Sequence, residues 1–247
     1  TVTGVQTCAL PISVEARVLL TTTSTANQYI FCNGNGGSAG YGMFVSANSQ
    51  SITIIYGGVA AYTSTYTIPT NTMTLLSMVK SGTTLRLYAN GTLAYSITAG
   101  TPVAPSGSFV VGCNGLSSPG ETFNGSIDEV RFWNRDLCAT EVAFRATCSA
   151  NGSDPGMLAL YKFNQGTGSA ANATINVAFD EVSATNNFTL NAFALTGGFS
   201  NWLTLASSFS TTCLAAPTLT NVTITGPGTL AVCMGKTITL TANGVTN

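Results

Sequence analysis

The chain has 247 residues and a formal net charge of −1, and it is 45% hydrophobic but only 7% charged. This hydrophobic content argues against disorder, and the scarcity of Lys, Glu and Arg argues against an α-helical protein. The balance of charge offers no basic face for nucleic acid, and the uncharged stretch 18–79 is interrupted throughout by polar residues and glycine, so it holds no membrane-spanning helix.

Short strand candidates separated by turn residues recur about every ten residues, which is typical of a β-sandwich or barrel. Asn90-Gly91 is the strongest hairpin signal in the sequence. A glycine-rich stretch, 34–40, is expected to be a loop. The expected strands of this part are 14–20, 28–32, 41–46, 51–56, 74–79, 84–89, 92–97 and 108–111.

The segment 121–145 differs because it holds eight of the seventeen charged residues of the chain. Residues 127–133 alternate as a strand that places Asp128 and Glu129 on opposite faces, and charge on both faces predicts a sheet edge or a covering helix. The one good helix candidate follows, with Cys138 at the N-cap and Glu141 three residues later. Two further strands are expected at 158–163 and 188–193, and residues 206–216 are an uncharged linker.

The N-terminal stretch Val2–Ile12 resembles the in-frame translation of a sequencing-library adapter. We therefore leave residues 1–13 out of the fold and expect the domain to occupy residues 14–205, with its first strands missing. Without Cys8, six cysteines remain. An even number of cysteines in a Thr- and Asn-rich chain suggests an oxidising, extracellular setting, where a signal peptide would precede the present first residue.

The cysteine spacing predicts two disulfides. Cys32 and Cys113 each end a strand and precede Asn-Gly, so they would bridge neighbouring strands. Cys138 and Cys148 would pair only if the helix ended near Arg145 and the chain folded back, because a continuous helix would hold them about 15 Å apart. The partners of Cys213 and Cys233 stay open.

Three stretches together resemble one family: Val79–Gly91, Phe123–Arg135 followed by Leu137 and Glu141-Val142, and Gly40–Ser46. They are similar to laminin-G-like modules of the concanavalin A-like superfamily, in the pentraxin-like version found in secreted bacterial surface proteins. The resemblance covers about residues 13–202 and implies an all-β fold, a jelly-roll β-sandwich with one short helix. Residues 217–247 resemble the start of an immunoglobulin-like domain, which predicts a longer multidomain chain.

The sequence offers little for catalysis. It has no histidine, which removes the commonest general base, and its adjacent carboxylates Asp128-Glu129 and Asp180-Glu181 do not have the same-face spacing that glycoside cleavage requires. We therefore predict that this domain is not an enzyme. A glycoside hydrolase is the less favoured reading.

Calcium is the usual ion of the family that the sequence resembles, and it prefers clustered oxygen ligands. The loop 113–121 has one carboxylate, so no cofactor is assigned, and the candidate calcium ligands are Asn33, Asn114 and Glu121. Turn geometry is the favoured explanation of the same asparagines, because asparagine tolerates the left-handed conformation that turns need. The candidate ligand-binding residues are Asn33, Asn35, Tyr41, Asn114 and Glu121.

These observations favour a non-catalytic, extracellular recognition or adhesion module that binds carbohydrate or a surface protein, with no nucleic-acid partner and no membrane insertion. The alternative is a glycan-binding accessory module of a secreted enzyme whose catalytic domain lies outside these residues. Shallow sheet faces and loop rims suit either role, through aromatic stacking and amide hydrogen bonds.

Overall fold

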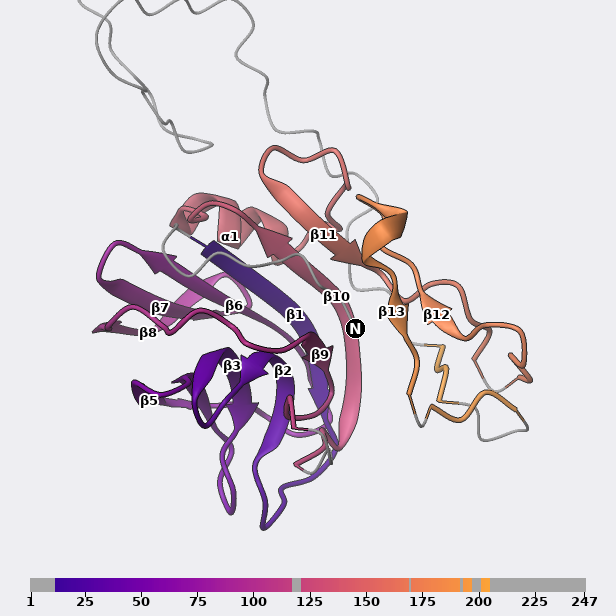
Figure 1. Cartoon of the computed structure of the whole chain (residues 1–247), viewed down its shortest axis with the longest axis horizontal. Coiled ribbons are helices and arrows are strands. Elements are labelled where there is room, and N and C mark those ends of the chain that lie inside the picture. Colours follow the sequence, from indigo (N-terminus) through magenta and orange to yellow (C-terminus); the bar gives the residue numbers. More distant parts are fainter. Residues whose placement is uncertain (1–11, 117–120, 169, 192, 197–200, 205–247) are drawn as a thin grey trace, which may run out of the picture.

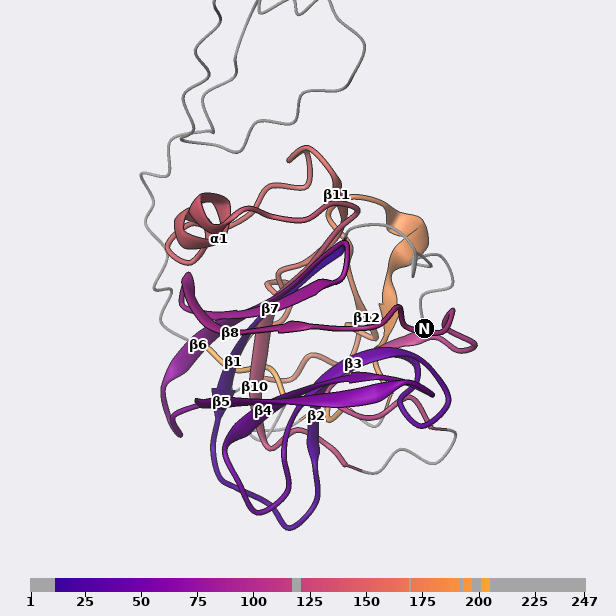
Figure 2. The same ribbon diagram turned by 90° about the vertical axis from the view of Figure 1, so that its left-hand side faces the viewer.

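The computed structural model describes residues 12–116, 121–168, 170–191, 193–196 and 201–204. These residues form two antiparallel sheets that pack face to face, with one short helix on the outside (Figures 1 and 2). This architecture confirms the predicted jelly-roll β-sandwich. The proposed adapter residues 1–11, the linker 206–216, the immunoglobulin-like segment 217–247 and Cys8, Cys213 and Cys233 lie outside the described residues.

The first sheet has six strands in the order β11-β10-β1-β6-β7-β8. Its strands are β1 (Ile12–Leu20), β6 (Met73–Ser81), β7 (Thr84–Ala89), β8 (Thr92–Thr98), β10 (Gly125–Trp133) and β11 (Met157–Tyr161). Asn90 and Gly91 have positive φ angles of 47° and 81° between β7 and β8, as the hairpin signal predicted.

The second sheet has five strands in the order β5-β4-β3-β2-β9. Its strands are β2 (Gln28–Asn35), β3 (Ala39–Val45), β4 (Ser51–Tyr56), β5 (Ala60–Thr67) and β9 (Phe109–Val111). The sequence did not predict β5, because its Ala, Thr, Ser and Tyr residues lack a clear alternation of apolar and polar positions.

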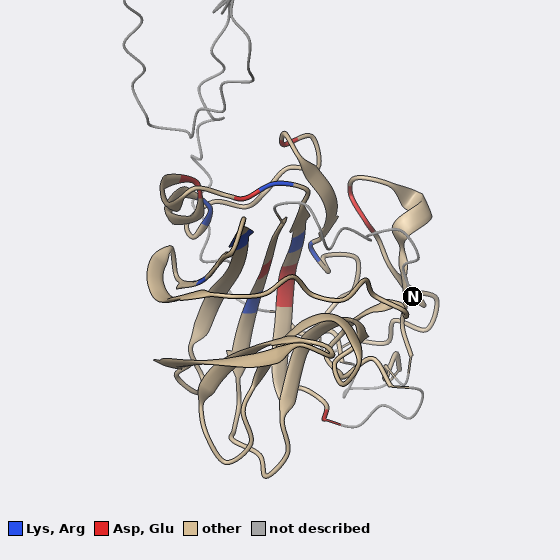
Figure 3. Cartoon of the chain, turned by 60° about the vertical axis from the view of Figure 1, so that its left-hand side comes forward, with Lys and Arg blue, Asp and Glu red and all other residues tan. Residues whose placement is uncertain are grey.

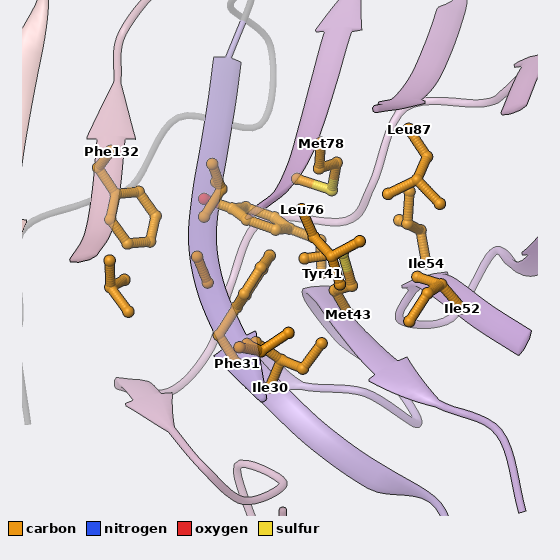
Figure 4. Close-up of a cluster of buried hydrophobic side chains, with 14 of the residues drawn as sticks. Ile30, Phe31, Tyr41, Met43, Ile52, Ile54, Leu76, Met78, Leu87 and Phe132 are labelled. Carbon is orange, nitrogen blue, oxygen red and sulfur yellow. The ribbon is translucent and has the colours of Figure 1, made fainter. Parts of the chain in front are cut away.

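The core fills the space between the two sheets, as Figure 4 shows for part of it. Alternate residues of β1 point inward, because side chains along a strand alternate between its faces. The rings of Phe109 and Phe132, one from each sheet, meet edge to face with centroids 4.3 Å apart. Aromatic contacts of this kind join the two layers.

The helix α1 (Ala139–Arg145) lies on the outer face of the six-stranded sheet (Figure 2). Cys138 is its N-cap and Glu141 completes a capping box, as predicted from the sequence. A small two-stranded sheet follows, made of β12 (Val177–Ala178) and β13 (Phe188–Thr189), with the 3-10 turn η1 (Ala184–Asn186) between them. Among the described residues, no helix has the length and apolar character needed to cross a membrane.

The strand β1 begins two residues before residue 14, the expected start of the domain. Ile12 and Ser13 belong to β1 and pair with Lys80 and Val79 of β6. Ile12 is 3% exposed and belongs to the core. The Ser13 hydroxyl donates to the backbone oxygen of Arg135 at 2.9 Å and accepts from the backbone nitrogen of Leu137 at 2.9 Å. Both residues are therefore part of the fold.

Candidate functional site

Two of the five predicted ligand-binding residues point into the core. Asn33 of β2 pairs with Tyr41 of β3 and with Phe109 of β9, and directly paired residues on neighbouring strands share a face. Tyr41 and Phe109 belong to the core, and Asn33 is only 2% exposed. Asn33 and Tyr41 therefore face the core, away from the surface on which the sequence analysis placed the binding site and its candidate metal ligand Asn33.

The reason is that the glycine-rich stretch is mostly strand. β2 continues to Asn35 and β3 begins at Ala39, so the loop shrinks to three residues. Gly40 has a φ of +87°, and a Cβ there would lie 1.8 Å from the backbone oxygen of Asn33, so only glycine fits. The Asn35 side-chain oxygen accepts from the backbone nitrogen of Gly37 at 2.9 Å, which makes Asn35 a turn residue.

The remaining two, Asn114 and Glu121, come together at the β9 side of the five-stranded sheet. The Asn114 amide donates to Glu121 Oε2 at 2.9 Å, and the amide of Asn27 donates to Glu121 Oε1 at 2.8 Å. The sequence analysis missed Asn27, which lies 94 residues from Glu121 in a loop with no motif. The carboxylate thus joins the loop before β2 to the loop after β9.

This group does not match the needs of calcium. Both oxygens of the Glu121 carboxylate already accept amide hydrogen bonds, and Asn33 faces the core. The Asn114 Oδ1 atom is buried and has no hydrogen-bond partner, but it is one neutral oxygen where calcium takes six to eight ligands. Across the described ranges, no three His, Cys, Asp or Glu side chains form a group that could hold a metal.

Neither predicted disulfide is present. Cys32, Cys113 and Cys138 are free thiols, and Cys148 is disulfide-bonded, but not to Cys138. The buried Cys32 thiol contacts the backbone oxygen of Gly34 with the sulfur 3.6 Å away, so its orientation is set by the hairpin. Burial raises the pKa of Cys32 and that of Cys113, which keeps both thiols protonated and poorly reactive.

An outward-facing strip crosses β4 and β5 of the five-stranded sheet and reaches Ser46, the residue that follows β3. No sequence motif indicated it. We call it the β3–β5 strip. It consists of Ser46, Thr53, Ile55, Ala61 and Thr63. The cross-strand pairs Ile55↔Ala61 and Thr53↔Thr63 alternate with the pair Ile54↔Tyr62, which packs against the core. The strip therefore lies on the opposite, outer face.

The strip combines a row of hydroxyls with a row of apolar side chains. The Thr53 hydroxyl lies 2.7 Å from that of Ser46 and 2.9 Å from that of Thr63, which forms a chain of three hydroxyls. Either oxygen of each pair can be the donor, so the chain can present a donor or an acceptor at its ends. Ala61 and Thr63 are exposed, Ser46 and Ile55 are half-buried, and Thr53 is only 2% exposed. A ligand on this face therefore reaches the hydroxyl chain at its two ends, Thr63 and Ser46.

The two sheets differ sharply in charge. β2, β3, β4, β5 and β9 contain no Asp, Glu, Lys or Arg, whereas most of the charged residues lie on the six-stranded sheet and around α1 (Figure 3). The charge-free stretch 18–79 seen in the sequence supplies four of the five strands of this layer, β2 to β5.

The outer face of the six-stranded sheet carries a buried charge cluster. Arg131 is fully buried, forms ion pairs with Glu15 at 3.5 Å and Glu129 at 3.2 Å, and donates to the backbone oxygens of Arg145 and Cys148 at 3.2 Å each. It thereby ties the end of α1 and the following turn to the sheet. The guanidinium of Arg145 lies 4.1 Å from the centre of the Trp133 ring. The covering helix that the sequence predicted is confirmed.

Asp128 and Glu129 do not point to opposite faces. Register shifts between β1 and β10 at this point, and Glu129 has a φ of +49°, which marks a β-bulge. Asp128 lies opposite the outward-facing Arg17 in the strand register, while Glu129 forms an ion pair with Arg131. Burial and the neighbouring carboxylate of Glu129 raise the pKa of Asp128 to about 6. Glu129 also accepts from the hydroxyl of Ser149 at 2.6 Å, so it is held in a structural network.

Comparison with known proteins agrees with this architecture. A laminin G family model, described as the concanavalin A-like lectin/glucanases superfamily, matches residues 2–143. This match covers more than half of the chain. The chain belongs to this superfamily. No curated protein matches the sequence significantly.

Solved structures similar to this chain are distant from it in sequence. A Bacteroides ovatus protein to which carbohydrate binding has been ascribed is 16% identical, with a TM-score of 0.58 over 73% of this chain and 52% of that one. This chain thus spans about half the length of that protein. The SAP-like pentraxin of Limulus polyphemus is 17% identical, with a TM-score of 0.45 over 57% of this chain and 71% of that one. The CBM40 module of the Ruminococcus gnavus IT-sialidase is 14% identical, with a TM-score of 0.46 over 55% and 83%.

Proposed function

We propose that this laminin-G-like jelly roll is a glycan-binding module that does not cleave its ligand. The observation that carries the proposal is the β3–β5 strip, where a chain of hydroxyls lies beside Ile55 and Ala61 on an outer sheet face. A sugar ring has an apolar C–H face and a rim of hydroxyls, so it matches such a surface on both counts. The carbohydrate binding ascribed to the Bacteroides ovatus protein supports the same reading.

The non-catalytic part of the proposal rests on the state of the carboxylates. Glu129 and Glu15 are held by Arg131, and Glu121 is held by two amides. Among the described residues, Asp128 is a carboxyl group with a raised pKa. The carboxylate beside it, Glu129, is buried in the ion-pair network and is not free to act on a sugar. Glycoside cleavage needs a second carboxylate free to act on the sugar.

The setting of the module is also a proposal. An extracellular or cell-surface position fits a recognition module, and residues 206–216 and 217–247 would then be a linker and the start of an immunoglobulin-like domain. Attachment to a secreted enzyme is the alternative setting, and a surface protein is the alternative ligand. The gene context separates these settings.

The test is affinity electrophoresis of the purified chain through gels that contain polysaccharides, together with an assay for released reducing ends. We expect retardation without release. Thr63→Arg places a long cation across the β3–β5 strip and should abolish retardation. Thr98→Arg is the matched control, since Thr98 is also an exposed threonine and lies on β8 of the other sheet. Release of reducing ends would overturn the non-catalytic reading, and retardation unaffected by Thr63→Arg would remove the strip from the site.

A further inference from the structure

We infer that the glycan bound at the β3–β5 strip is uncharged: a neutral polysaccharide without uronate, sulfate or sialate groups. This inference rests on the proposed function and adds the chemical class of the ligand. Its starting point is the distribution of cations over the described residues, which are Arg17, Lys80, Arg86, Arg131, Arg135, Arg145 and Lys162.

None of these cations belongs to the five-stranded sheet. Four lie on strands of the six-stranded sheet, Arg145 lies on α1, and Arg135 and Lys162 lie in the chain that follows β10 and β11. Most are also engaged where they are. The Lys80 ammonium donates to the backbone oxygen of Gly82 at 2.8 Å, Arg135 pairs with Glu141 at 2.7 Å, and Lys162 pairs with Glu181 at 2.9 Å.

An anionic sugar would find no partner for its charge at the strip. A carboxylate or sulfate that leaves water for a protein surface loses hydration, and this loss is offset when Arg or Lys donates charge-assisted hydrogen bonds to it. The strip offers hydroxyls, an isoleucine and an alanine instead.

A neutral sugar meets the strip without such a loss. The hydroxyls of Thr63 and Ser46 are linked through the buried hydroxyl of Thr53, so they can exchange donor and acceptor roles, and sugar hydroxyls do the same. Removing the exposed hydroxyl at Thr63 while keeping the branched shape should weaken binding about three- to tenfold, which is the contribution of one neutral hydrogen bond. Binding should also be insensitive to salt, since no charge pair would be screened.

The experiment compares glycans that differ in charge alone. Hydroxyethyl cellulose and carboxymethyl cellulose share one backbone, as do methyl-esterified and de-esterified polygalacturonate, and neutral mannan, xylan and arabinan widen the panel. The whole chain is passed through gels of each at low and high NaCl. We expect retardation by one or more neutral polymers, unchanged by salt, and none by the anionic member of a pair.

Variants locate the effect. Thr63→Val should weaken retardation by the neutral polymer, whereas Thr98→Val should not, with circular dichroism and the melting temperature confirming that both fold. Retardation by anionic polymers alone, falling with salt, would overturn the neutral class while leaving glycan binding standing. No retardation by any polymer would overturn the proposed function itself. Equal retardation of Thr63→Val and wild type would overturn the assignment to the strip.

Discussion

Glu15 and Arg131 form an ion pair in which both side chains are completely buried, on directly paired positions of β1 and β10. The carboxylate also accepts from the Ser77 hydroxyl at 2.8 Å and from the Trp133 indole nitrogen at 3.2 Å. Glu15 therefore satisfies three donors from β6 and β10. Because Arg131 in turn holds the backbone at the end of α1, this pair links two central strands to the covering helix.

Glu15→Ala should destabilise the fold strongly, because it leaves Arg131, Ser77 and Trp133 as buried donors without their shared acceptor. Breaking a buried pair in this way costs about 3–5 kcal/mol. Urea unfolding followed by tryptophan fluorescence measures the loss. Glu181→Ala is the matched control, since its pair with Lys162 is partly exposed and is worth about 0–1 kcal/mol. Equal losses in the two variants would contradict the structural role given to Glu15.

Asp128 predicts how stability depends on pH. Burial, reinforced by the carboxylate of Glu129, raises its pKa from 3.8 to about 6 in the folded state. The unfolded chain therefore releases this proton at lower pH than the folded chain does, so the contribution of Asp128 to stability is full below pH 3.8 and is lost as pH rises to about 6. Because the side chain is partly exposed, we expect a loss of about 1–2 kcal/mol.

Asp128→Asn removes this titration. The difference in unfolding free energy between the variant and wild type should therefore grow in favour of the variant between about pH 4 and about pH 7. Glu141 changes stability with pH in the opposite direction, in the variant and in wild type alike. Burial acts to raise its pKa, but hydrogen bonds from Arg135 and from Cys138 together lower it. The difference between the two proteins cancels that effect. A constant difference across the range would show that Asp128 titrates normally.

The sequence predicted most strands because their apolar residues alternate, as on β1, where Val14, Ala16 and Val18 reach the core. The cap of α1 was also readable, because Cys138 and Glu141 have the spacing of a capping box. Both signals are local, so they survive without knowledge of the partner strands.

The candidate site was harder to predict from the sequence, because β-bulges and strand pairing determine which side chains share a face. A single extra residue at Glu129 moves Asp128 to the outer face, and no residue type marks that position in advance. Glycines at 34 and 40 suggested a loop, although they close a strand pair. The β3–β5 strip exists only once β5 is placed beside β4, and β5 has no periodic apolar pattern.

Calcium should leave the protein unchanged. The Glu121 carboxylate is saturated by the amides of Asn27 and Asn114, and the orphaned Asn114 Oδ1 is a single neutral oxygen. Adding millimolar calcium or a chelator should therefore shift the melting temperature by less than about 1 °C, because a ligand stabilises only in proportion to its occupancy. A rise of several degrees with calcium, absent in Glu121→Gln, would show that the two amides yield to the ion.

Two N-terminal truncations test where the domain begins. A chain that starts at Ile12 keeps all of β1, whereas a chain that starts at Val14 loses a core side chain and the Ser13 hydroxyl that joins the backbone of Arg135 and Leu137. Losing a buried isoleucine side chain costs about 2–4 kcal/mol, which lowers the melting temperature of a domain this size by roughly 5–10 °C. The first truncation should have the same melting temperature as the full chain. The residues that it removes precede β1, and from Val2 onward they belong to the stretch 2–12 that resembles an adapter. If both truncations melt like the full chain, the two residues contribute nothing; if both melt lower, the segment before Ile12 belongs to the fold.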